Sequence, residues 1–190
     1  AAGWADGTAA IWDVAERRRV HDLDGHVGSV QELAFSPTSE LLATASSDGT
    51  IRLWDAASGR LRKILEGGKF LSVAFSPDGA TLAAADESGR VWLWDARSGA
   101  FRSRGTLPCG QEALTVLVFT PRGEALAVGS LRGMVGLWDV ATGQELLTLQ
   151  SAGPQINGLA FAPDGRTLAV CGHDGAASIV LKRLSDAVRD

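Results

Sequence analysis

The sequence contains no tyrosine, one methionine and only two cysteines among its 190 residues. Two cysteines cannot hold a chain of this length together through disulfides, so the fold does not depend on them. No apolar run approaches the roughly 20 residues of a membrane-spanning helix, and we expect no contact with a membrane. A concentrated basic surface is also lacking, because 18 basic and 22 acidic side chains give a formal net charge of −4. This balance argues against a protein that binds a nucleic-acid backbone.

Glycine is abundant, with 23 residues, while 45% hydrophobic and 21% charged residues are typical of a globular chain. The length fits one ordinary domain or part of a larger repetitive one. Arginine outnumbers lysine 15 to 3 and alanine is frequent, which favours an origin in a bacterial genome rich in G and C.

A Trp-Asp dipeptide recurs four times, at spacings of 42, 40 and 44 residues. The four copies are Trp12-Asp13, Trp54-Asp55, Trp94-Asp95 and Trp138-Asp139. A phenylalanine followed by a turn sequence recurs in the same phase, at Phe35, Phe75, Phe119 and Phe161. Two markers that stay in phase over four copies indicate an internal repeat.

Within one repeat the apolar pattern is typical of strands and not of helices. Short apolar runs cover Val30–Phe35, Leu41–Ala45, Ile51–Trp54 and Leu61–Leu65. Turn residues separate them, and Ser47-Asp48-Gly49 is a strong signal for a two-strand turn. No window keeps a helical spacing for more than about two turns. Each repeat is therefore predicted to form four short antiparallel strands.

One such sheet cannot bury both of its apolar faces alone, so like sheets must pack side by side in a stack or a ring. At this point the chain resembles the tryptophan–aspartate (WD) repeat β-propellers. Their signature is a Gly-His, a strand-turn-strand block and a closing Trp-Asp. In this sequence the signature reads Gly25-His26, Ala34-Phe35-Ser36-Pro37, Ser47-Asp48-Gly49 and Trp54-Asp55.

The expected fold is all-β, a β-propeller of four-stranded antiparallel blades, with residues 1–190 as a single segment. We expect a partial blade at 1–25, full blades at 26–66, 67–110 and 111–153, and a last blade at 154–190, about four and a half blades in all. The resemblance implies a ring of about seven blades. A piece of such a ring is favoured over a closed four-blade ring, and its open flanks should expose apolar sheet faces.

The resemblance also implies a hydrogen-bonded tetrad of Trp, Asp, Ser or Thr, and His within one blade. The matching residues are His26, Thr44, Asp48 and Trp54, and only the blade of residues 26–66 carries the full set. A buried indole N–H needs an acceptor, a hydroxyl supplies one, and the His links that hydroxyl to a turn carboxylate. A structural lock is therefore favoured over a catalytic triad, since the sequence has no Gly-x-Ser-x-Gly elbow.

Other motifs with chemical associations are incomplete. Gly67-Gly68-Lys69 lacks the full glycine–lysine–hydroxyl spacing of a phosphate loop. The histidines and cysteines share no ligand spacing, so neither a metal nor a cofactor is expected. Cys171 falls in a predicted buried strand, where a thiol behaves as a small hydrophobe. The aspartates of the Trp-Asp pairs are expected to cap turn N–H groups and not to act as acids or bases.

For propellers of this kind, the resemblance implies a partner-contact face formed by residues that flank the first strand of each blade or precede its turn aspartate. In this sequence they are Ser29, Gln31, Ser47, Lys69, Leu71, Glu87, Ala113, Thr115, Leu131, Gln155, Asn157 and His173. The set is small and nearly uncharged, which fits a modest protein contact. Trp92 stands where the preceding repeat has Arg52, and we expect it either to pack between blades or to anchor a partner.

The function favoured by these patterns is a non-catalytic scaffold or regulatory module that binds proteins through its face loops. A sensing propeller within a larger effector, such as a kinase or a nucleotide-hydrolysing protein, is the alternative. An enzyme or a nucleic-acid binder is less favoured, because no ring of carboxylates or metal ligands converges and the arginines are dispersed. No secretion signal is visible, and a cytoplasmic location is the default expectation.

Overall fold

The computed structural model describes residues 1–150, 155–172 and 179–183, with backbone alone for 101–104, 150 and 179–183. All regular structure in these residues is β-strand, which confirms the expected all-β class. They contain no helix that has the length and hydropathy needed to cross a membrane.

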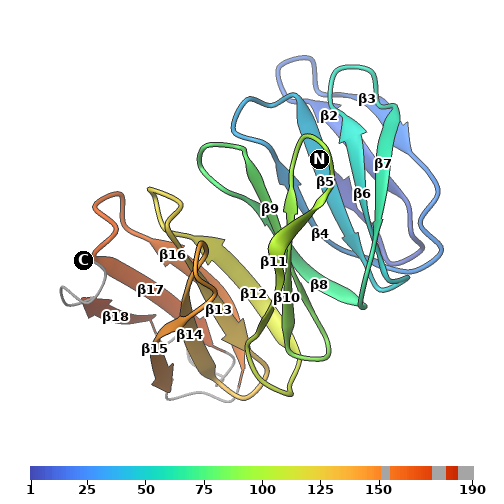
Figure 1. The fold of residues 1–190 in the computed structure, drawn as a ribbon. Coiled ribbons are helices and arrows are strands. Elements are labelled where there is room, and N and C mark those ends of the chain that lie inside the picture. Colours follow the sequence, from blue (N-terminus) through green and yellow to red (C-terminus); the bar gives the residue numbers. More distant parts are fainter. Residues whose placement is uncertain (151–154, 173–178, 184–190) are drawn as a thin grey trace.

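The strands form five antiparallel sheets in which consecutive strands are neighbours (Figure 1). The first sheet contains β1 (Ala2–Gly3), β2 (Ala9–Asp13) and β3 (Arg18–Leu23). The second contains β4 (Val30–Phe35), β5 (Leu41–Ser46), β6 (Thr50–Asp55) and β7 (Leu61–Glu66). The third contains β8 (Phe70–Phe75), β9 (Thr81–Asp86), β10 (Arg90–Asp95) and β11 (Phe101–Pro108). The fourth contains β12 (Leu114–Phe119), β13 (Ala125–Ser130), β14 (Met134–Asp139) and β15 (Glu145–Gln150), and the fifth β16 (Ile156–Phe161), β17 (Thr167–Gly172) and β18 (Ile179–Arg183).

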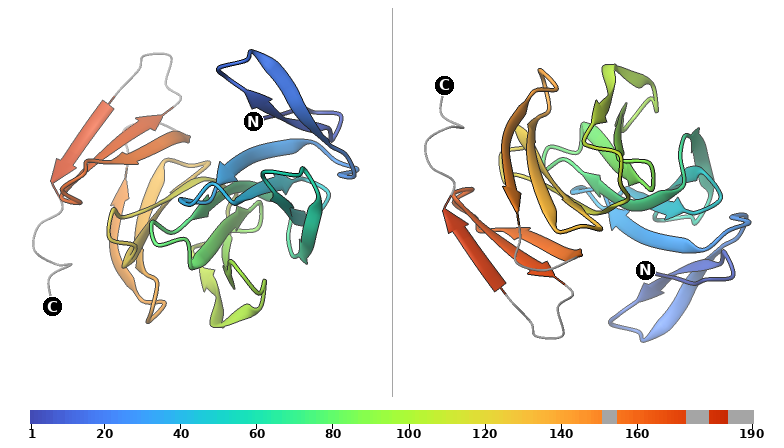
Figure 2. Two further views of the ribbon diagram at one scale, coloured as in Figure 1. Left: turned by 90° about the horizontal axis from the view of Figure 1, so that it is seen from above. Right: turned by 90° about the horizontal axis from the view of Figure 1, so that it is seen from below.

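The sheets are arranged as an open arc around a common axis, with the first and fifth sheets at its two ends (Figure 2). The strands β4, β8, β12 and β16 contact one another in order along the inner side of the arc. Each has a register shift at the same place, between its first and third residues, as at Val30 and Glu32. This equivalence confirms the four-stranded blades of a propeller as the repeating unit.

Hydrogen bonds between neighbouring inner strands tie the sheets together. The carboxylate of Glu32 on β4 accepts bonds from the hydroxyl of Ser72 and the backbone N–H of Val73 on β8. The same Ser72 hydroxyl accepts the N–H of Leu117 on β12, at 3.1 Å. Because Glu32 is largely buried, the pKa of its carboxyl group is raised, although both hydrogen bonds oppose that shift.

The apolar core lies between adjacent sheets and follows one scheme. One face of each sheet carries small and branched side chains, such as Ile51 and Leu53 in the second sheet. This face packs against the face of the next sheet that carries its tryptophan, which in the third sheet includes Phe70, Leu82 and Trp94. The same pairing recurs between the third and fourth sheets, where Trp138 is the tryptophan. The repeat marker therefore fills the space between the sheets.

The aspartates of the Trp-Asp pairs cap turns, as the sequence predicted. Asp55 Oδ1 accepts the N–H of Ser58 at 2.8 Å, and Arg62 donates to its other oxygen. The bonds from Arg62 and Ser58 hold the pKa of Asp55 well below its usual range. Equivalent caps join Asp13 to Glu16, Asp95 to Ser98 and Asp139 to Thr142.

The outer faces of the first and fifth sheets are not covered within the described residues. Trp54, Trp94 and Trp138 are at most 8% exposed, whereas Trp12 on the outer face of the first sheet is 45% exposed. Cys171 is exposed on the outer face of the fifth sheet. The prediction that Cys171 is buried was therefore wrong, because a strand that is central in its own sheet still has one face that only a further sheet covers.

Candidate functional site

The predicted tetrad is assembled in the second sheet as a continuous chain of hydrogen bonds. Trp54 Nε1 donates to Thr44 Oγ1 at 3.0 Å, and Thr44 Oγ1 lies 2.7 Å from His26 Nε2. His26 Nδ1 lies 2.8 Å from Asp48 Oδ2. Since the Asp48 carboxylate only accepts, His26 carries its proton on Nδ1 and accepts the Thr44 hydroxyl at Nε2. Every polar atom along this chain is satisfied.

Burial and hydrogen bonds shift the pKa values of the tetrad. Desolvation lowers the pKa of His26 and outweighs the opposing effect of Asp48, which favours the neutral imidazole. Burial alone would raise the pKa of Asp48, yet bonds from Thr50, His26 and the Val27 N–H lower it to about 2. The Thr44 side chain is completely buried, so no substrate atom can reach its hydroxyl. This geometry supports a structural lock and not a nucleophile.

The third sheet closes the equivalent space with a different pair, which sequence reasoning missed. Trp92 Nε1 donates to Asp86 Oδ2 at 2.7 Å, and Asp86 is 1% exposed. Strand register pairs Ala84 with Trp92 just as it pairs Thr44 with Arg52. The Trp92 ring lies 6.1 Å from Trp94, nearly parallel to it, so Trp92 is a packing residue and not an exposed anchor.

The loop before the third sheet makes room for this pair. It contains only residues 67–69 and no histidine, whereas the loop between β3 and β4, which carries His26, contains residues 24–29. A Cβ atom on Gly68 would lie 2.3 Å from Asp86 Oδ2, and one on Gly67 would lie 2.5 Å from the ring of Phe70. The glycines of Gly67-Gly68-Lys69 therefore serve side-chain packing. The signal available in the sequence was the joint appearance of Asp86 and Trp92.

The predicted contact-face residues are brought together at one end of the strands. In each of three sheets, the residue that follows the second strand donates its backbone N–H to the carbonyl oxygen of the residue that precedes the inner strand. These bonds run from Ser47 to Ser29 at 3.0 Å, from Glu87 to Lys69 at 3.0 Å and from Leu131 to Ala113 at 2.9 Å. The third member of each set, Gln31, Leu71 or Thr115, lies at the start of the adjoining inner strand.

None of the described members of this face is buried. Gln31, Lys69, Glu87, Leu131 and Asn157 are exposed, and Ser29, Ser47, Leu71, Ala113, Thr115 and Gln155 are half-buried. His173 lies outside the described residues. Lys69 and Glu87 form an ion pair at 3.1 Å, and the Thr115 hydroxyl donates to the carbonyl oxygens of Gly129 and Ile156. The Thr115 side chain is thus already engaged within the fold.

The most exposed apolar side chain at this end was missed by the sequence reasoning. Val27, in the loop after His26, is 91% exposed, and Leu131 in the fourth sheet is 47% exposed. The Val27 backbone N–H is fixed by Asp48 Oδ2 at 3.1 Å, which holds the side chain outward. A valine directly after the Gly-His pair was the available signal. Isolated exposed apolar residues on a rigid loop are suited to contact another protein.

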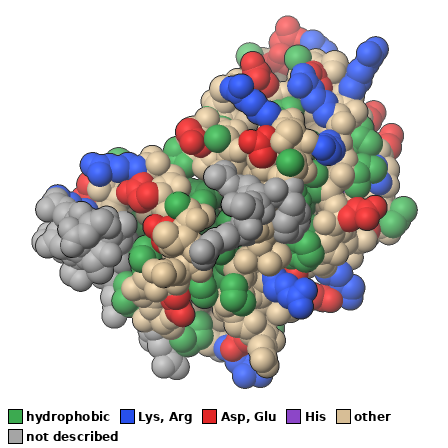
Figure 3. All heavy atoms as spheres, viewed as in Figure 1, with side chains coloured by type: hydrophobic (Ala, Val, Ile, Leu, Met, Phe, Trp, Pro, Cys, Tyr) green, Lys and Arg blue, Asp and Glu red, His purple; other side chains and the backbone are tan. Residues whose placement is uncertain are grey.

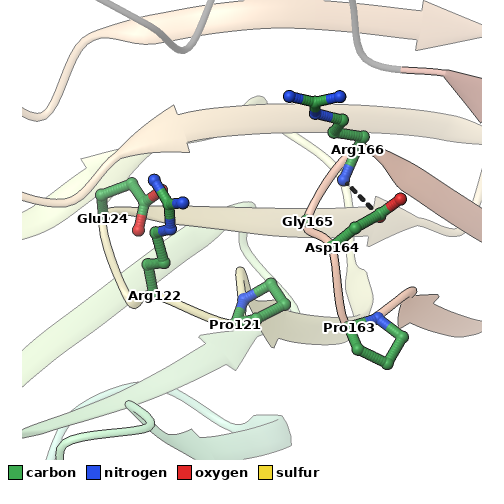
Figure 4. A pocket seen from close by; sticks show the side chains of 7 residues that line it. All are labelled: Pro121, Arg122, Glu124, Pro163, Asp164, Gly165 and Arg166. Carbon is green, nitrogen blue, oxygen red and sulfur yellow. Dashed lines mark hydrogen bonds between the residues drawn. The ribbon is translucent and has the colours of Figure 1, made fainter.

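A hollow at the other end of the strands has mixed charge. Its volume is about 240 Å3, and it lies between the turns Pro121–Glu124 and Pro163–Arg166 (Figure 4). The side chains of Arg122 and Glu124 lie toward one another, and the Arg166 N–H donates to Asp164 Oδ1 at 2.9 Å. Across the face seen in Figure 3, acidic and basic side chains of the described residues are also interspersed. The described side chains form no continuous basic patch in the hollow or on the face seen in Figure 3.

The described residues contain no group of three or more His, Cys, Asp or Glu side chains that could hold a metal ion. Cys109 is largely buried, and that burial, together with the charge of Glu145, raises the pKa of its thiol to about 12. A protonated thiol is a poor nucleophile and a poor metal ligand.

Comparison with known families agrees with the architecture. Residues 17–55, 59–95 and 143–179 match the family described as WD domain, G-beta repeat, and together they make up more than half of the chain. The chain belongs to this family.

Curated relatives match shorter stretches. The chain is 41% identical over 71 residues to THO complex subunit 3 of Arabidopsis thaliana, covering 35% of the chain and 22% of that protein. It is 58% identical over 38 residues to Striatin-4 of Homo sapiens, covering 20% and 5%. It is 40% identical over 67 residues to NACHT domain- and WD repeat-containing protein 1 of Mus musculus, covering 35% and 4%. The chain thus spans less than a quarter of each relative, and these eukaryotic relatives give no support to the expected bacterial origin.

Proposed function

We propose that the chain is a non-catalytic scaffold module that binds protein partners through loops at one end of its strands. This end carries Ser29, Gln31, Val27 and Leu131. The observation that carries this proposal is the repeated backbone pairing of loop residues in three sheets. The pairing holds the loops on a rigid frame, while their side chains vary from sheet to sheet. Such an arrangement suits recognition of a partner surface.

The composition of this face favours protein over nucleic acid as the partner. It combines exposed Val27 and Leu131 with the uncharged Gln31 and Asn157, and its one described lysine, Lys69, is paired with Glu87. A phosphate-backbone site would need several unpaired basic groups in one place. Among the relatives, THO complex subunit 3 is by name a subunit of a complex. This supports a role in assembly.

The absence of catalysis is part of the same proposal. His26, Thr44 and Asp48 have the composition of a triad, but Trp54 closes this group and its hydroxyl is fully buried. A general base or a nucleophile must be reachable by substrate.

A regulatory propeller within a larger effector is the second candidate. The mouse relative joins, by its name, a NACHT domain to WD repeats, and the chain covers 4% of it. The two candidates share the same contact face and differ in whether the partner lies on the same chain.

Affinity capture with face variants tests the proposal. The chain is the bait in extracts of the cells that naturally produce it, and Gln31→Arg/Leu131→Arg is compared with Val14→Arg. Val14 is 88% exposed in the turn after β2, at the opposite end of the strands. We expect a reproducible set of captured proteins that the double variant loses and the Val14 variant keeps. Equal capture by all three baits would contradict the proposed face.

A further inference from the structure

The fourth sheet leaves empty the space that the second and third sheets fill. The offset in residue number that relates Val30 to Leu114 also relates His26 to Gly110, Thr44 to Val128 and Arg52 to Gly136, and strand register pairs Val128 with Gly136 as it pairs Thr44 with Arg52. A Cβ atom on Gly110 would meet no atom within 4 Å. Neither the histidine lock nor the Trp92–Asp86 pair has a counterpart here.

The result is a cavity of about 330 Å3 between the loop after β11 and the strands β14 and β15. This volume is at the lower end of the roughly 300–1,000 Å3 typical of ligand pockets. The Trp138 indole forms one wall, and its Nε1 lies 2.7 Å from the point where a Cβ atom on Gly136 would stand. Thr44 supplies the hydroxyl that accepts the Trp54 N–H, but Val128 at the equivalent position has no hydroxyl. No acceptor for the Trp138 N–H is found in the described part of the chain.

The polar groups of the cavity are mainly negative. Glu112 and Glu145 both line it, and Glu112 Oε2 is buried without a hydrogen-bond partner. The cation of Arg132, at Nε, lies 3.7 Å from that oxygen on a side chain that is 80% exposed. This distance is beyond hydrogen-bonding range, so the carboxylate oxygen keeps its capacity to accept a bond. The thiol of Cys109 in the wall stays protonated and adds no charge.

We propose that this cavity binds the basic side chain of a protein partner, with its ammonium or guanidinium group between Glu112 and Glu145 and its aliphatic stem against Trp138. An indole face attracts a cation, and a half-buried carboxylate gains more from a charged donor than from water. The inference rests on the proposed function for the source of the side chain. Glu112 directly precedes Ala113 of the contact face, so a partner seated on that face reaches the cavity.

The test uses n-butylammonium, the side-chain analogue of lysine, and needs no partner protein. The chain is labelled with 5-fluorotryptophan, and the Trp138 fluorine signal is assigned with Trp138→Phe. We expect a saturable shift of that signal with n-butylammonium and none with neutral 1-butanol at the same concentrations. An equal shift with 1-butanol, or no shift with the ammonium ion, would overturn the proposal.

Charge variants separate ion binding from a merely apolar hollow. Glu112→Gln/Glu145→Gln should raise the dissociation constant for n-butylammonium about tenfold, as expected for the loss of one half-buried and one exposed ion pair. Glu124→Gln, which changes the net charge by one unit at an exposed turn outside the cavity, should leave it unchanged. Arg132→Gln removes the competing cation at an exposed position and should strengthen binding.

Unchanged affinity in the double variant would contradict the site. Dispersed signals from the other tryptophans show that a variant is folded. Because the probe is a small cation, a negative result here leaves the capture experiment on the contact face unaffected, and the reverse also holds.

Discussion

Trp92 donates its indole N–H to Asp86 over 2.7 Å, and this pair in the third sheet occupies the place that His26 and Thr44 occupy in the second. Two chemically different sets of side chains therefore close the same space in neighbouring blades. Each set satisfies its buried polar atoms internally, as a dry space between sheets requires. In the fourth sheet the space is open.

Thr44→Val tests the lock in the second sheet. The substitution keeps the shape but leaves the Trp54 N–H and His26 Nε2 without their shared partner, so we expect a loss of about 3 kcal/mol in the free energy of unfolding. Urea unfolding measures this loss, with Thr106→Val as a control, since Thr106 is exposed on β11. Unfolding of Thr44→Val at the same urea concentration as the natural chain would show that the hydrogen-bond chain contributes nothing.

Trp92→Phe tests the substitute pair in the third sheet. Phenylalanine retains packing against Phe70 but removes the donor to buried Asp86, so the free energy of unfolding should fall by about 2 kcal/mol. Trp4→Phe is the matched control, because Trp4 is 40% exposed and should change stability by no more than about 0.5 kcal/mol. Equal stability of the two variants would argue against a structural role for the Trp92 N–H.

Glu32→Gln should make the chain more stable at neutral pH. Burial raises the folded-state pKa of Glu32. The stability that protonated Glu32 contributes is therefore fully present below the unfolded-state pKa near 4.5, and it is lost as pH rises through the folded-state pKa. Glutamine keeps an oxygen that accepts the Ser72 and Val73 donors and has no charge to desolvate. The melting temperature of the variant should exceed that of the natural chain at pH 7.5, and the difference should shrink toward pH 4. A pH-independent difference would refute this explanation.

Ser39→Gly should stabilise the turn between β4 and β5. Ser39 has a φ of 59°, and glycine stands at the equivalent places in the next three blades, as at Gly79 with a φ of 69°. An L-residue in the left-handed region costs roughly 1 kcal/mol, although the flexibility of glycine in the unfolded chain offsets part of the gain. Thermal melting should show a rise of a few degrees for Ser39→Gly, whereas Ser58→Gly, in a turn without this strain, should show none.

The period of the Trp-Asp pairs and the apolar runs between turn residues predicted the strands and the four-stranded sheets, whereas the tetrad was implied by the resemblance to WD-repeat propellers. Trp54, Trp94 and Trp138 fill equivalent gaps between neighbouring sheets, which explains why the tryptophan recurs at this period. The Trp92–Asp86 pair was not predicted, since it replaces a motif instead of repeating it and depends on a shortened loop. The exposure of Cys171 was missed for another reason: a pattern of apolar residues identifies a strand but does not say whether a further sheet covers it.

Site-specific photo-cross-linking tests the central proposal most directly. A benzophenone amino acid replaces Leu131 on the contact face or Val14 at the opposite end of the strands, in cells that naturally contain the chain. We predict that irradiation joins a distinct protein to the chain from position 131 and none from position 14. Cross-linking from position 14 alone would place the partner on the other end of the strands and contradict the proposed face.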